Sequence, residues 1–298
     1  MEIDENLINQ LVDPGPVIMP QNLEPLEDDV YVDSEEIDYR SINVKITSHA
    51  PIVILFGHEY CGKTLALFRM TRYLEKMGYL VTPDITFRDD TIYHRMCTGY
   101  KHMVHRDYCP GGNDMSSFML VRVLDPTGRI VLQILDAGGH YFYGNNGYKE
   151  FPLFIEQIIH SPYNRLIWLY FVELGWKDHS ERIKYVEQLR DIHMRTHQVG
   201  RRDNEIFLFC KADKNFHLYN KKGYPDITAF HSQTMNEYPG IFDGYVRKGL
   251  AGFLFGKYNY KSIAFSAGST ARTDPRLIWQ ESDSWYCEQL WKAIKSCM

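Results

Sequence analysis

The sequence predicts an α/β domain with a mostly parallel β-sheet, and three observations support that prediction. Short apolar runs of strand length alternate with segments of helical periodicity from about residue 50 to the C-terminus. Hydrophobic residues make up 44% of the 298 residues, which is enough for a sizeable core. One pair of strand candidates is joined by a tight turn that contains Pro and Gly, so we also expect an antiparallel hairpin.

The first half of the domain supplies several strand candidates and one helix. Apolar and polar residues alternate over 42–46, which predicts an edge strand. The apolar run at 51–56 predicts a buried strand, and the spacing over 64–77 predicts a helix directly after it. Two further strands are expected at 118–124 and 129–135, on either side of the turn D-P-T-G. The predicted inward-facing positions of the helix are Leu65, Leu67, Met70, Leu74 and Met77.

The second half continues the alternation of strands and helices. A short helix is predicted at 151–159, a buried strand at 165–172 and an amphipathic helix at 181–194. Strands are predicted at 206–210 and 262–265. A closing helix is predicted at 285–294, with one face formed by Trp285, Leu290, Trp291 and Ile294.

Residues 1–40 differ in composition from the rest of the chain. They are acidic and carry four prolines, so we expect an N-terminal arm that buries little surface, followed by the domain at 41–298. The prolines are Pro14, Pro16, Pro20 and Pro25.

Charge and cysteine content narrow the class of protein. The formal net charge of -5 predicts no general attraction to nucleic acid or to an anionic membrane. The six cysteines include no C-x-x-C pair, which favours reduced thiols and a cytoplasmic protein. The N-terminus lacks the pattern of a signal peptide, and Cys297 is next to last rather than fourth from last. We therefore expect no direct membrane anchor.

Residues 57–64, called the phosphate loop below, have the sequence GHEYCGKT and match G-x-x-x-x-G-K-[ST]. They lie between a strand candidate and a helix candidate, which is the context that this motif requires. Glycines let successive backbone N–H groups point at phosphate oxygens, and the start of the helix adds the positive end of its dipole. We expect Lys63 to reach the phosphates and Thr64 to offer its hydroxyl to Mg²⁺. The flanking strand and helix disfavour the alternative of a Gly-rich turn without a ligand.

Residues 136–140, DAGGH, form what we call the trigger segment. Asp136 follows the end of a strand candidate, where a carboxylate can hold Mg²⁺ through water. Gly139 would offer a backbone N–H to a terminal phosphate, and His140 would orient the attacking water. The pattern D-x-x-G is weak by itself. Its alternatives are a turn-forming Asp136 and a solvent-exposed His140.

Two further strand ends carry residues suited to a purine base. Residues 210–213, CKAD, are called the recognition turn, and residues 266–268, SAG, the second recognition turn. Guanine presents its N1–H and N2–H₂ donors side by side, and one carboxylate, that of Asp213, can accept both. The stem of Lys211 can cover the base, and a backbone N–H of the second recognition turn can meet guanine O6. Either turn alone could be an ordinary strand-end turn.

Together these motifs resemble those of the Ras-like GTPases of the translation-factor-related P-loop class. The double glycine of the trigger segment looks most like Arf and Rag proteins, and the following His looks like translational GTPases. The resemblance covers about residues 50–298 and is carried by motifs. It implies a P-loop NTPase fold with a six-stranded mixed sheet, one hairpin strand antiparallel, flanked by helices. It also implies GTP or GDP as ligand, Mg²⁺ as cofactor, a protein effector or regulator as partner, and switching on hydrolysis.

The resemblance assigns a role to each matching residue. Catalysis falls to Lys63 and His140, and the metal to Thr64 and Asp136. The nucleotide-binding residues that it implies are Gly57, Glu59, Tyr60, Cys61, Gly62, Lys63, Thr64, Gly139, Lys211, Asp213, Ser266 and Ala267.

The chain departs from the family at three positions. Cys210 stands where the family prefers an Asn that braces the phosphate loop, which predicts weaker nucleotide binding. Glu59 stands where Ras proteins keep Gly, and a carboxylate there would repel phosphate or block an arginine finger, so we expect slow hydrolysis. Gly268 replaces a common Lys or Leu, which matters little if the backbone recognises the base.

Two long regions carry further candidate residues. The region 83–117 should hold the first switch, and Thr91 is the preferred Mg²⁺ ligand among Thr86, Thr91, Thr98, Ser116 and Ser117. A zinc site there is less favoured than an ordinary loop, although the region contains His94, Cys97, His102, His105 and Cys109. The insert 214–261 is rich in aromatic residues, which favours extra packed helices over a partner-binding surface.

The motifs leave three hypotheses for function. The leading one is a GTP-binding switch that hydrolyses GTP slowly or with a partner's help. The second is a GTP-binding interaction module that hardly hydrolyses, favoured by Glu59 and by the unassigned first-switch Thr. The third is an ATP-using P-loop enzyme such as a kinase, and Asp213 argues against it.

Overall fold

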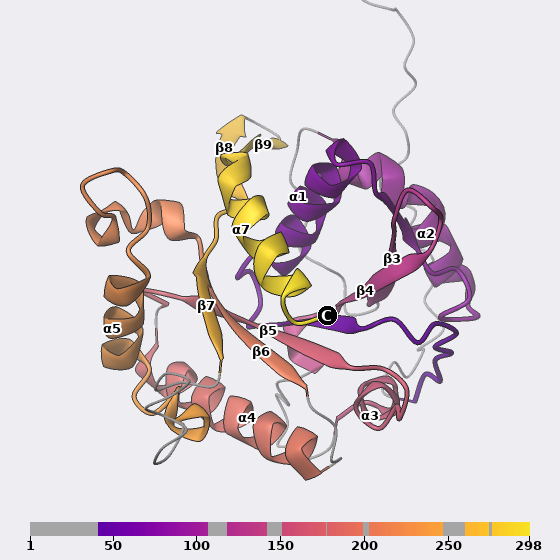
Figure 1. Cartoon of the computed structure of the whole chain (residues 1–298), viewed down its shortest axis with the longest axis horizontal. Helices are drawn as coiled ribbons and strands as arrows, with labels where there is room; N and C mark the ends of the chain where they lie inside the picture. The colour runs from indigo at the N-terminus through magenta and orange to yellow at the C-terminus, as the bar shows by residue number, and fades with distance from the viewer. Residues whose placement is uncertain are drawn as a thin grey trace, which may run out of the picture. The chain divides into compact units, whose positions relative to one another are not determined.

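A seven-stranded sheet with the order β2-β3-β4-β1-β5-β6-β7 forms the centre of the fold (Figure 1). The computed structural model describes residues 41–106, 118–141, 151–176, 178–198, 203–246, 260–273 and 276–298. The strands are β1 (Ile52–Phe56), β2 (Leu80–Pro83), β3 (Met119–Leu124), β4 (Ile130–Asp136), β5 (Leu166–Glu173), β6 (Asn204–Cys210) and β7 (Lys261–Ala264).

The strands β4, β1, β5, β6 and β7 run parallel, whereas β3 is antiparallel to β4 and β2 is antiparallel to β3. The mostly parallel sheet and the β3–β4 hairpin are therefore as predicted. The count of six strands is not, because β2 adds a seventh at the edge of the sheet. With four residues, β2 is too short to show a clear alternation in the sequence.

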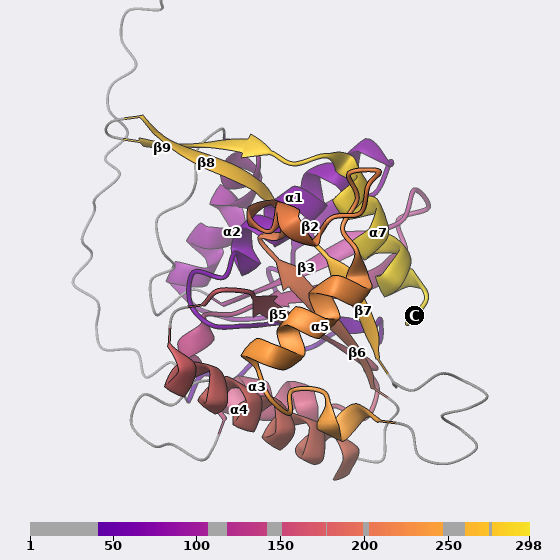
Figure 2. The same cartoon turned by 90° about the vertical axis from the view of Figure 1, so that its left-hand side faces the viewer.

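Helices cover both faces of the sheet (Figure 1). They are α1 (Lys63–Lys76), α2 (Thr91–Val104), α3 (Leu153–Ile159), α4 (His179–Gln198), α5 (Ile227–Glu237) and α7 (Ser284–Lys295). α1 and α7 lie on one face, and α3 and α4 lie on the other. A separate two-stranded hairpin, β8 (Gly268–Thr273) and β9 (Arg276–Glu281), lies on the side of α1 and α7 (Figure 2). No helix of the described residues is both long and apolar enough to cross a membrane.

The core lies between the sheet and these helices. Every residue of β1 is buried, and α1 buries Leu67, Met70 and Leu74 as its spacing predicts. The predicted inward position Met77 is wrong: it caps the end of α1 and is 55% exposed. The closing helix α7 buries its predicted face, with Leu290, Trp291 and Ile294 in the core and Trp285 half-buried.

The predicted edge strand at 42–46 does not form. Its side chains do alternate between exposed and half-buried positions. The N–H of Lys45 donates to the carbonyl of Phe87 (2.9 Å) and that of Val44 to the side chain of Gln157 (3.0 Å). These bonds go to a loop and to a helix side chain, so no ladder with a neighbouring strand follows.

The region 83–117 contains a helix, which corrects the expectation of a loop. Asp90 caps α2 by accepting a hydrogen bond from the N–H of Tyr93 (2.8 Å). Tyr93, Tyr100 and Val104 bury one face of α2. Residues 107–117, which include Cys109, Ser116 and Ser117, lie outside the described residues.

The insert 214–261 contributes the additional helix α5, capped by Asp226. Phe230, Tyr238, Phe242 and Tyr245 are buried, which confirms the packing interpretation for these four residues. Residues 247–259 of the insert and the N-terminal arm 1–40 lie outside the described residues, so the predicted domain boundaries stay predictions.

Candidate functional site

The parallel strands bring the sequence motifs to one edge of the sheet. Because β4, β1, β5, β6 and β7 are neighbours and point the same way, their carboxyl ends follow one another along that edge. This edge is the usual place for ligands in open α/β sheets. The segments that follow these strands are, in the same order, the trigger segment, the phosphate loop, the turn after Glu173, the recognition turn and the second recognition turn.

The phosphate loop joins β1 directly to α1. Lys63 is the first residue of α1 and is 6% exposed. Its ammonium donates to the carbonyl oxygens of Gly57 and His58, at 2.9 Å each. Gly57 has no room for a side chain, since a Cβ there would lie 2.7 Å from the Cβ of Phe171 in β5. The loop is thus curled around its own lysine and rests on β5.

The two predicted metal-binding side chains touch each other. The hydroxyl of Thr64 donates to Asp136 Oδ2 at 2.8 Å, and Asp136 is 5% exposed. The other oxygen, Asp136 Oδ1, is buried and has no hydrogen-bond partner among the described residues. Burial raises the pKa of Asp136, while the hydrogen bond from Thr64 and the charge of Lys63 oppose that rise. A hydroxyl beside a buried, unsatisfied carboxylate oxygen fits Mg²⁺ or a Mg²⁺-bound water.

The trigger segment packs directly on the phosphate loop. A Cβ on Gly139 would lie 2.9 Å from both Glu59 N and Gly57 O, so only glycine fits this contact. The short helix η1 (Gly139–Tyr141) begins here, and Tyr141 anchors it in the core. The side chain of the predicted catalytic residue His140 lies outside the described part of the structure.

In the recognition turn, Lys211 forms an ion pair, whereas Asp213 forms none within the described residues. Lys211 adopts a left-handed backbone conformation (φ 51°) and forms an ion pair with Glu173 at the end of β5. Asp213, in the short helix η2 (Ala212–Lys214), is half-buried. Within the described residues its carboxylate has no hydrogen bond or ion pair.

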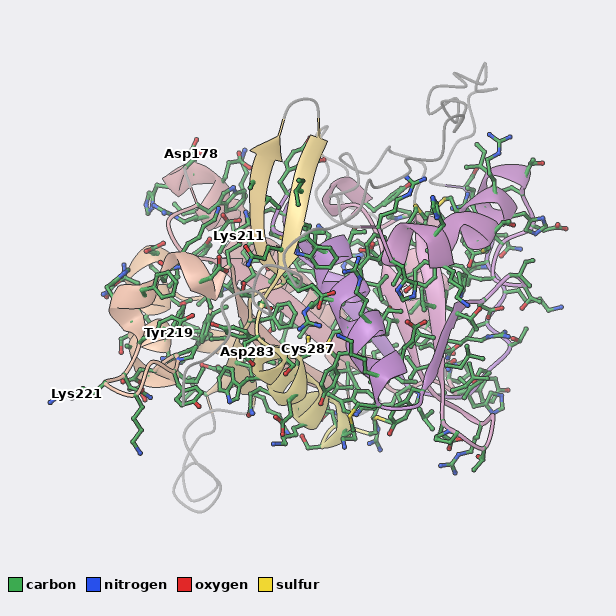
Figure 3. All side chains as sticks on the ribbon, turned by 90° about the horizontal axis from the view of Figure 1, so that it is seen from above. Asp178, Lys211, Tyr219, Lys221, Asp283 and Cys287 are labelled. Carbon is green, nitrogen blue, oxygen red and sulfur yellow. The ribbon has the colours of Figure 1, made fainter. Side chains whose placement is uncertain are left out.

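A pair of tyrosines from two other segments lies within electrostatic reach of Asp213. The hydroxyls of Tyr219 and Tyr286 lie 2.5 Å apart, so Tyr219 contacts α7; Figure 3 labels Tyr219 and also Asp283, the residue before α7. Burial raises the pKa of both tyrosines, and the negative charge of Asp213 raises each further. The charge of Asp213 therefore acts on the hydroxyl pair.

The second recognition turn is held in place by β9 and by the recognition turn. The N–H of Ala212 donates to Phe265 O (3.1 Å), which links the two turns. Ser266 is fully buried, and its carbonyl accepts a hydrogen bond from the hydroxyl of Ser282 (2.5 Å). The carbonyl of Ala267 accepts one from the indole of Trp279 (3.1 Å). These contacts fix the backbone of this turn.

Three residues were not singled out from the sequence: His58 in the phosphate loop, and Glu173 and Trp176 at the end of β5 and just after it. The ring of His58 is 5% exposed and stacks flat on Trp176, with centroids 3.8 Å apart. Its Nδ1 lies 2.6 Å from the carbonyl oxygen of Glu59. Burial lowers the pKa of His58 to about 4, so the ring is neutral at pH 7. One signal was present: Glu173 is a charged residue at the end of a hydrophobic strand, and Asp136 likewise ends β4.

The first-switch candidates do not reach the phosphate loop in the described residues. The hydroxyl of Thr86 donates to Asp84 (2.6 Å), and that of Thr98 donates to the carbonyl of His94 (3.0 Å). Thr91 is exposed in the first turn of α2. No three His, Cys, Asp or Glu side chains of the described part are grouped so that they could hold a metal ion. Cys109, one of the zinc candidates, is outside it.

Comparisons with known proteins find little similarity in sequence. No family model and no curated protein sequence matches the chain. Among solved structures, one similar chain is described as nucleolar GTP-binding protein 1 from Plasmodium falciparum. The match has 11% sequence identity and a TM-score of 0.36, and covers 75% of this chain and 80% of that chain.

Proposed function

We propose that this chain binds GTP and GDP together with Mg²⁺ and acts as a switch that hydrolyses GTP slowly or with a partner's help. The observation that carries the proposal is a set of contacts between neighbouring segments along the carboxyl edge of the sheet. Thr64 bonds to Asp136, Lys211 to Glu173 and Ala212 to Phe265. These contacts support a site along this edge in which the phosphate loop would hold the phosphates, Asp136 the metal and Asp213 the base of one nucleoside triphosphate.

At the phosphate end, the chain supplies positive charge and backbone donors. Lys63 would exchange its two loop carbonyls for phosphate oxygens, and the first amides of α1 would donate to the same phosphates. Thr64 and Asp136 would hold Mg²⁺, which when bound neutralises charge on the phosphates. Gly139 would donate its N–H to the terminal phosphate, and His140 would orient water.

At the base end, the half-buried carboxylate of Asp213 selects guanine over adenine. It accepts two adjacent donors from guanine, whereas adenine offers no such pair. The stem of Lys211, held by Glu173, would cover one face of the base. The backbone of Ser266 and Ala267 would meet guanine O6.

A second candidate function is a GTP-binding interaction module with little hydrolysis. The packing of Gly139 against Glu59 and Gly57 favours it, because the trigger segment must leave this contact before a terminal phosphate fits. Single-turnover GTP hydrolysis by the full chain separates the two functions. The switch hypothesis expects a rate that falls on His140→Ala, and the module hypothesis expects negligible hydrolysis in both proteins.

Competition between GTP and ATP for the full chain, measured with a fluorescent GDP analogue in Mg²⁺, tests the proposed ligand. We expect GTP to compete better, and Asp213→Asn to reduce that preference by about 10- to 100-fold, since it removes a charge-assisted pair. The control is Asp243→Asn, the same substitution at an exposed aspartate that pairs with Arg190. A wild-type preference for ATP would overturn the proposal.

A further inference from the structure

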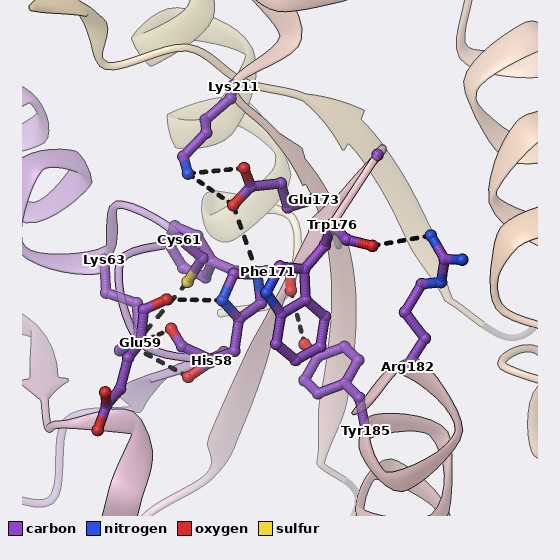
Figure 4. Close-up of polar contacts among 12 residues, drawn as sticks. His58, Glu59, Cys61, Lys63, Phe171, Glu173, Trp176, Arg182, Tyr185 and Lys211 are labelled. Atoms are coloured by element: carbon purple, nitrogen blue, oxygen red, sulfur yellow. Dashed lines mark hydrogen bonds and ion pairs between the residues drawn. The ribbon is translucent and has the colours of Figure 1, made fainter. Parts of the chain in front are cut away.

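The carboxylate of Glu173 connects the two ends of the proposed nucleotide site. Glu173 is the last residue of β5, the strand that lies between β1 and β6. Its two oxygens accept hydrogen bonds from Lys211 Nζ at 2.7 and 2.6 Å, and Oε2 lies 3.4 Å from His58 Nε2 (Figure 4). One side chain thus contacts both the recognition turn and the phosphate loop.

The phosphate loop rests on the end of β5 through packing as well. Gly57 lies directly on Phe171, and the ring of His58 stacks on Trp176 with an interplanar angle of 3°. Trp176 follows closely after Glu173, and its carbonyl accepts a hydrogen bond from Arg182 (2.8 Å; Figure 4). The end of β5 is therefore a fixed platform for the loop.

The recognition turn depends on the same strand end through Lys211. A left-handed backbone is unfavourable for a lysine, so the turn needs an outside contact to hold it. The ion pair with Glu173 supplies that contact, and both side chains are mostly shielded from water, at 27% and 16% exposure. A thiol forms only weak hydrogen bonds, so the buried Cys210 cannot replace this ion pair.

We infer that Glu173 is a positioning residue that keeps the phosphate loop and the recognition turn in the mutual arrangement that a nucleotide needs. The inference rests on the proposed function and adds a residue to it. Glu173 acts through Lys211 and through the platform at the end of β5. Without its charge, the ammonium of Lys211 loses its partner and the stem is no longer fixed over the base.

The test compares variants of the full chain by their affinity for GDP in Mg²⁺. Glu173→Gln and Lys211→Met, which keeps an apolar stem, should each weaken binding by about tenfold. The double variant should also lose only about tenfold, because both changes remove the same ion pair. Lys211→Arg keeps the charge and should restore binding close to the wild-type value.

Glu237→Gln is the matched control. Glu237 accepts a hydrogen bond from the N–H of Gly175 (2.7 Å) and so holds the turn that follows Glu173. It bonds neither to the phosphate loop nor to Lys211 within the described residues. It should leave GDP affinity unchanged. Equal effects of Glu173→Gln and Glu237→Gln, tighter binding by Glu173→Gln, or multiplied losses in the double variant would each overturn the inference.

Hydrogen exchange of the nucleotide-free protein separates this inference from the proposed function. We expect Glu173→Gln, but not Glu237→Gln, to speed exchange in both 57–63 and 211–214. A wild-type protein that binds no guanine nucleotide refutes the proposed function, and exchange still decides whether Glu173 holds the two segments. Exchange that is unchanged in both segments refutes the positioning role.

Discussion

The phosphate end and the base end of the proposed site differ in how their side chains are engaged. At the phosphate end, Lys63 donates to two carbonyls of its own loop, Thr64 donates to Asp136, and Gly139 lies against the loop. At the base end, Asp213 is half-buried and has no partner among the described residues. In the proposed site, the residues at the phosphate end would have to give up internal contacts before they bind a ligand. Asp213 at the base end would accept a ligand without losing a contact.

This difference bears on how affinity is divided between the two ends. A hydrogen bond exchanged for another contributes only about 1 kcal/mol net, so the phosphate contacts yield less than their number suggests. A preorganised acceptor such as Asp213 avoids that exchange, and its turn is already fixed by Lys211 and Ala212. We therefore expect the base end to orient the nucleotide. The phosphate end should rearrange to a degree that depends on the number of charged phosphates that the nucleotide carries.

The largest effect should come from Lys63→Met, which tests whether the phosphate end and the base end bind their parts of the nucleotide independently. Removing the ammonium takes away charge-assisted bonds to the phosphates, and GDP affinity should fall by roughly two to three orders of magnitude. Guanosine, which has no phosphate, should bind as it does to the wild type. Calorimetry with GDP and ligand-observed NMR with guanosine measure the two ends separately. Equal losses for both ligands would show that the ends are not independent in this way.

The acid sensitivity of the phosphate end should be the next largest effect. The folded-state pKa of His58 is about 4, below its ordinary 6.5, because the ring is buried. Between these values the unfolded state binds more protons, so stability is retained above pH 6.5 and lost as the pH falls toward 4. The loss from this one group should reach roughly 2 to 3 kcal/mol near pH 4.5.

His58→Phe isolates this contribution, since it keeps an aromatic ring on Trp176 and removes the titrating group. Denaturant unfolding of both proteins at pH 7.5 and pH 4.5 measures it. The variant should gain stability relative to the wild type at the lower pH. If the difference between the two proteins does not change with pH, burial of a neutral His58 is not what makes the fold sensitive to acid.

The phosphate loop, the strand before it and the helix after it could be predicted from neighbouring residues in the sequence. The run Ile52–Phe56, the loop motif and the helix after it are contiguous, so their order needs no information from elsewhere in the chain. The helix α2 also had local signals, the cap Asp90 and the buried positions Tyr93 and Tyr100. We expected the first switch and an ordinary loop in this region and did not predict the helix.

Other features depend on contacts that the sequence does not display. The position of Glu173 between the two ends of the site follows from the lateral order of β1, β5 and β6. His58 occupies a variable position of the loop motif, and it is buried because Trp176, far along the chain, stacks on it. The segment 42–46 has the alternation of a strand, but its backbone bonds go to Phe87 and Gln157. In each case the long-range partner decides the outcome.

The smallest predicted effect concerns backbone strain within the phosphate loop. Tyr60 has a left-handed backbone (φ 62°) although it is not glycine, and its side chain is 79% exposed. Tyr60→Gly should therefore raise the free energy of unfolding by up to about 1 kcal/mol, because strain is relieved and little buried contact is lost. Gly62→Ala, at φ 96° in the same loop, should lower it by a similar amount.

Denaturant unfolding of the nucleotide-free proteins measures the stability of Tyr60→Gly and Gly62→Ala. Their affinity for GDP shows whether the same changes affect nucleotide binding. If the loop's shape is set by Lys63 and by the platform at the end of β5, Tyr60→Gly should leave GDP affinity nearly unchanged while stability rises. A loss of affinity without a gain in stability would mean that the exposed ring of Tyr60 itself contacts the ligand. The phosphate end would then hold a side chain that, like Asp213 at the base end, is available before the nucleotide binds.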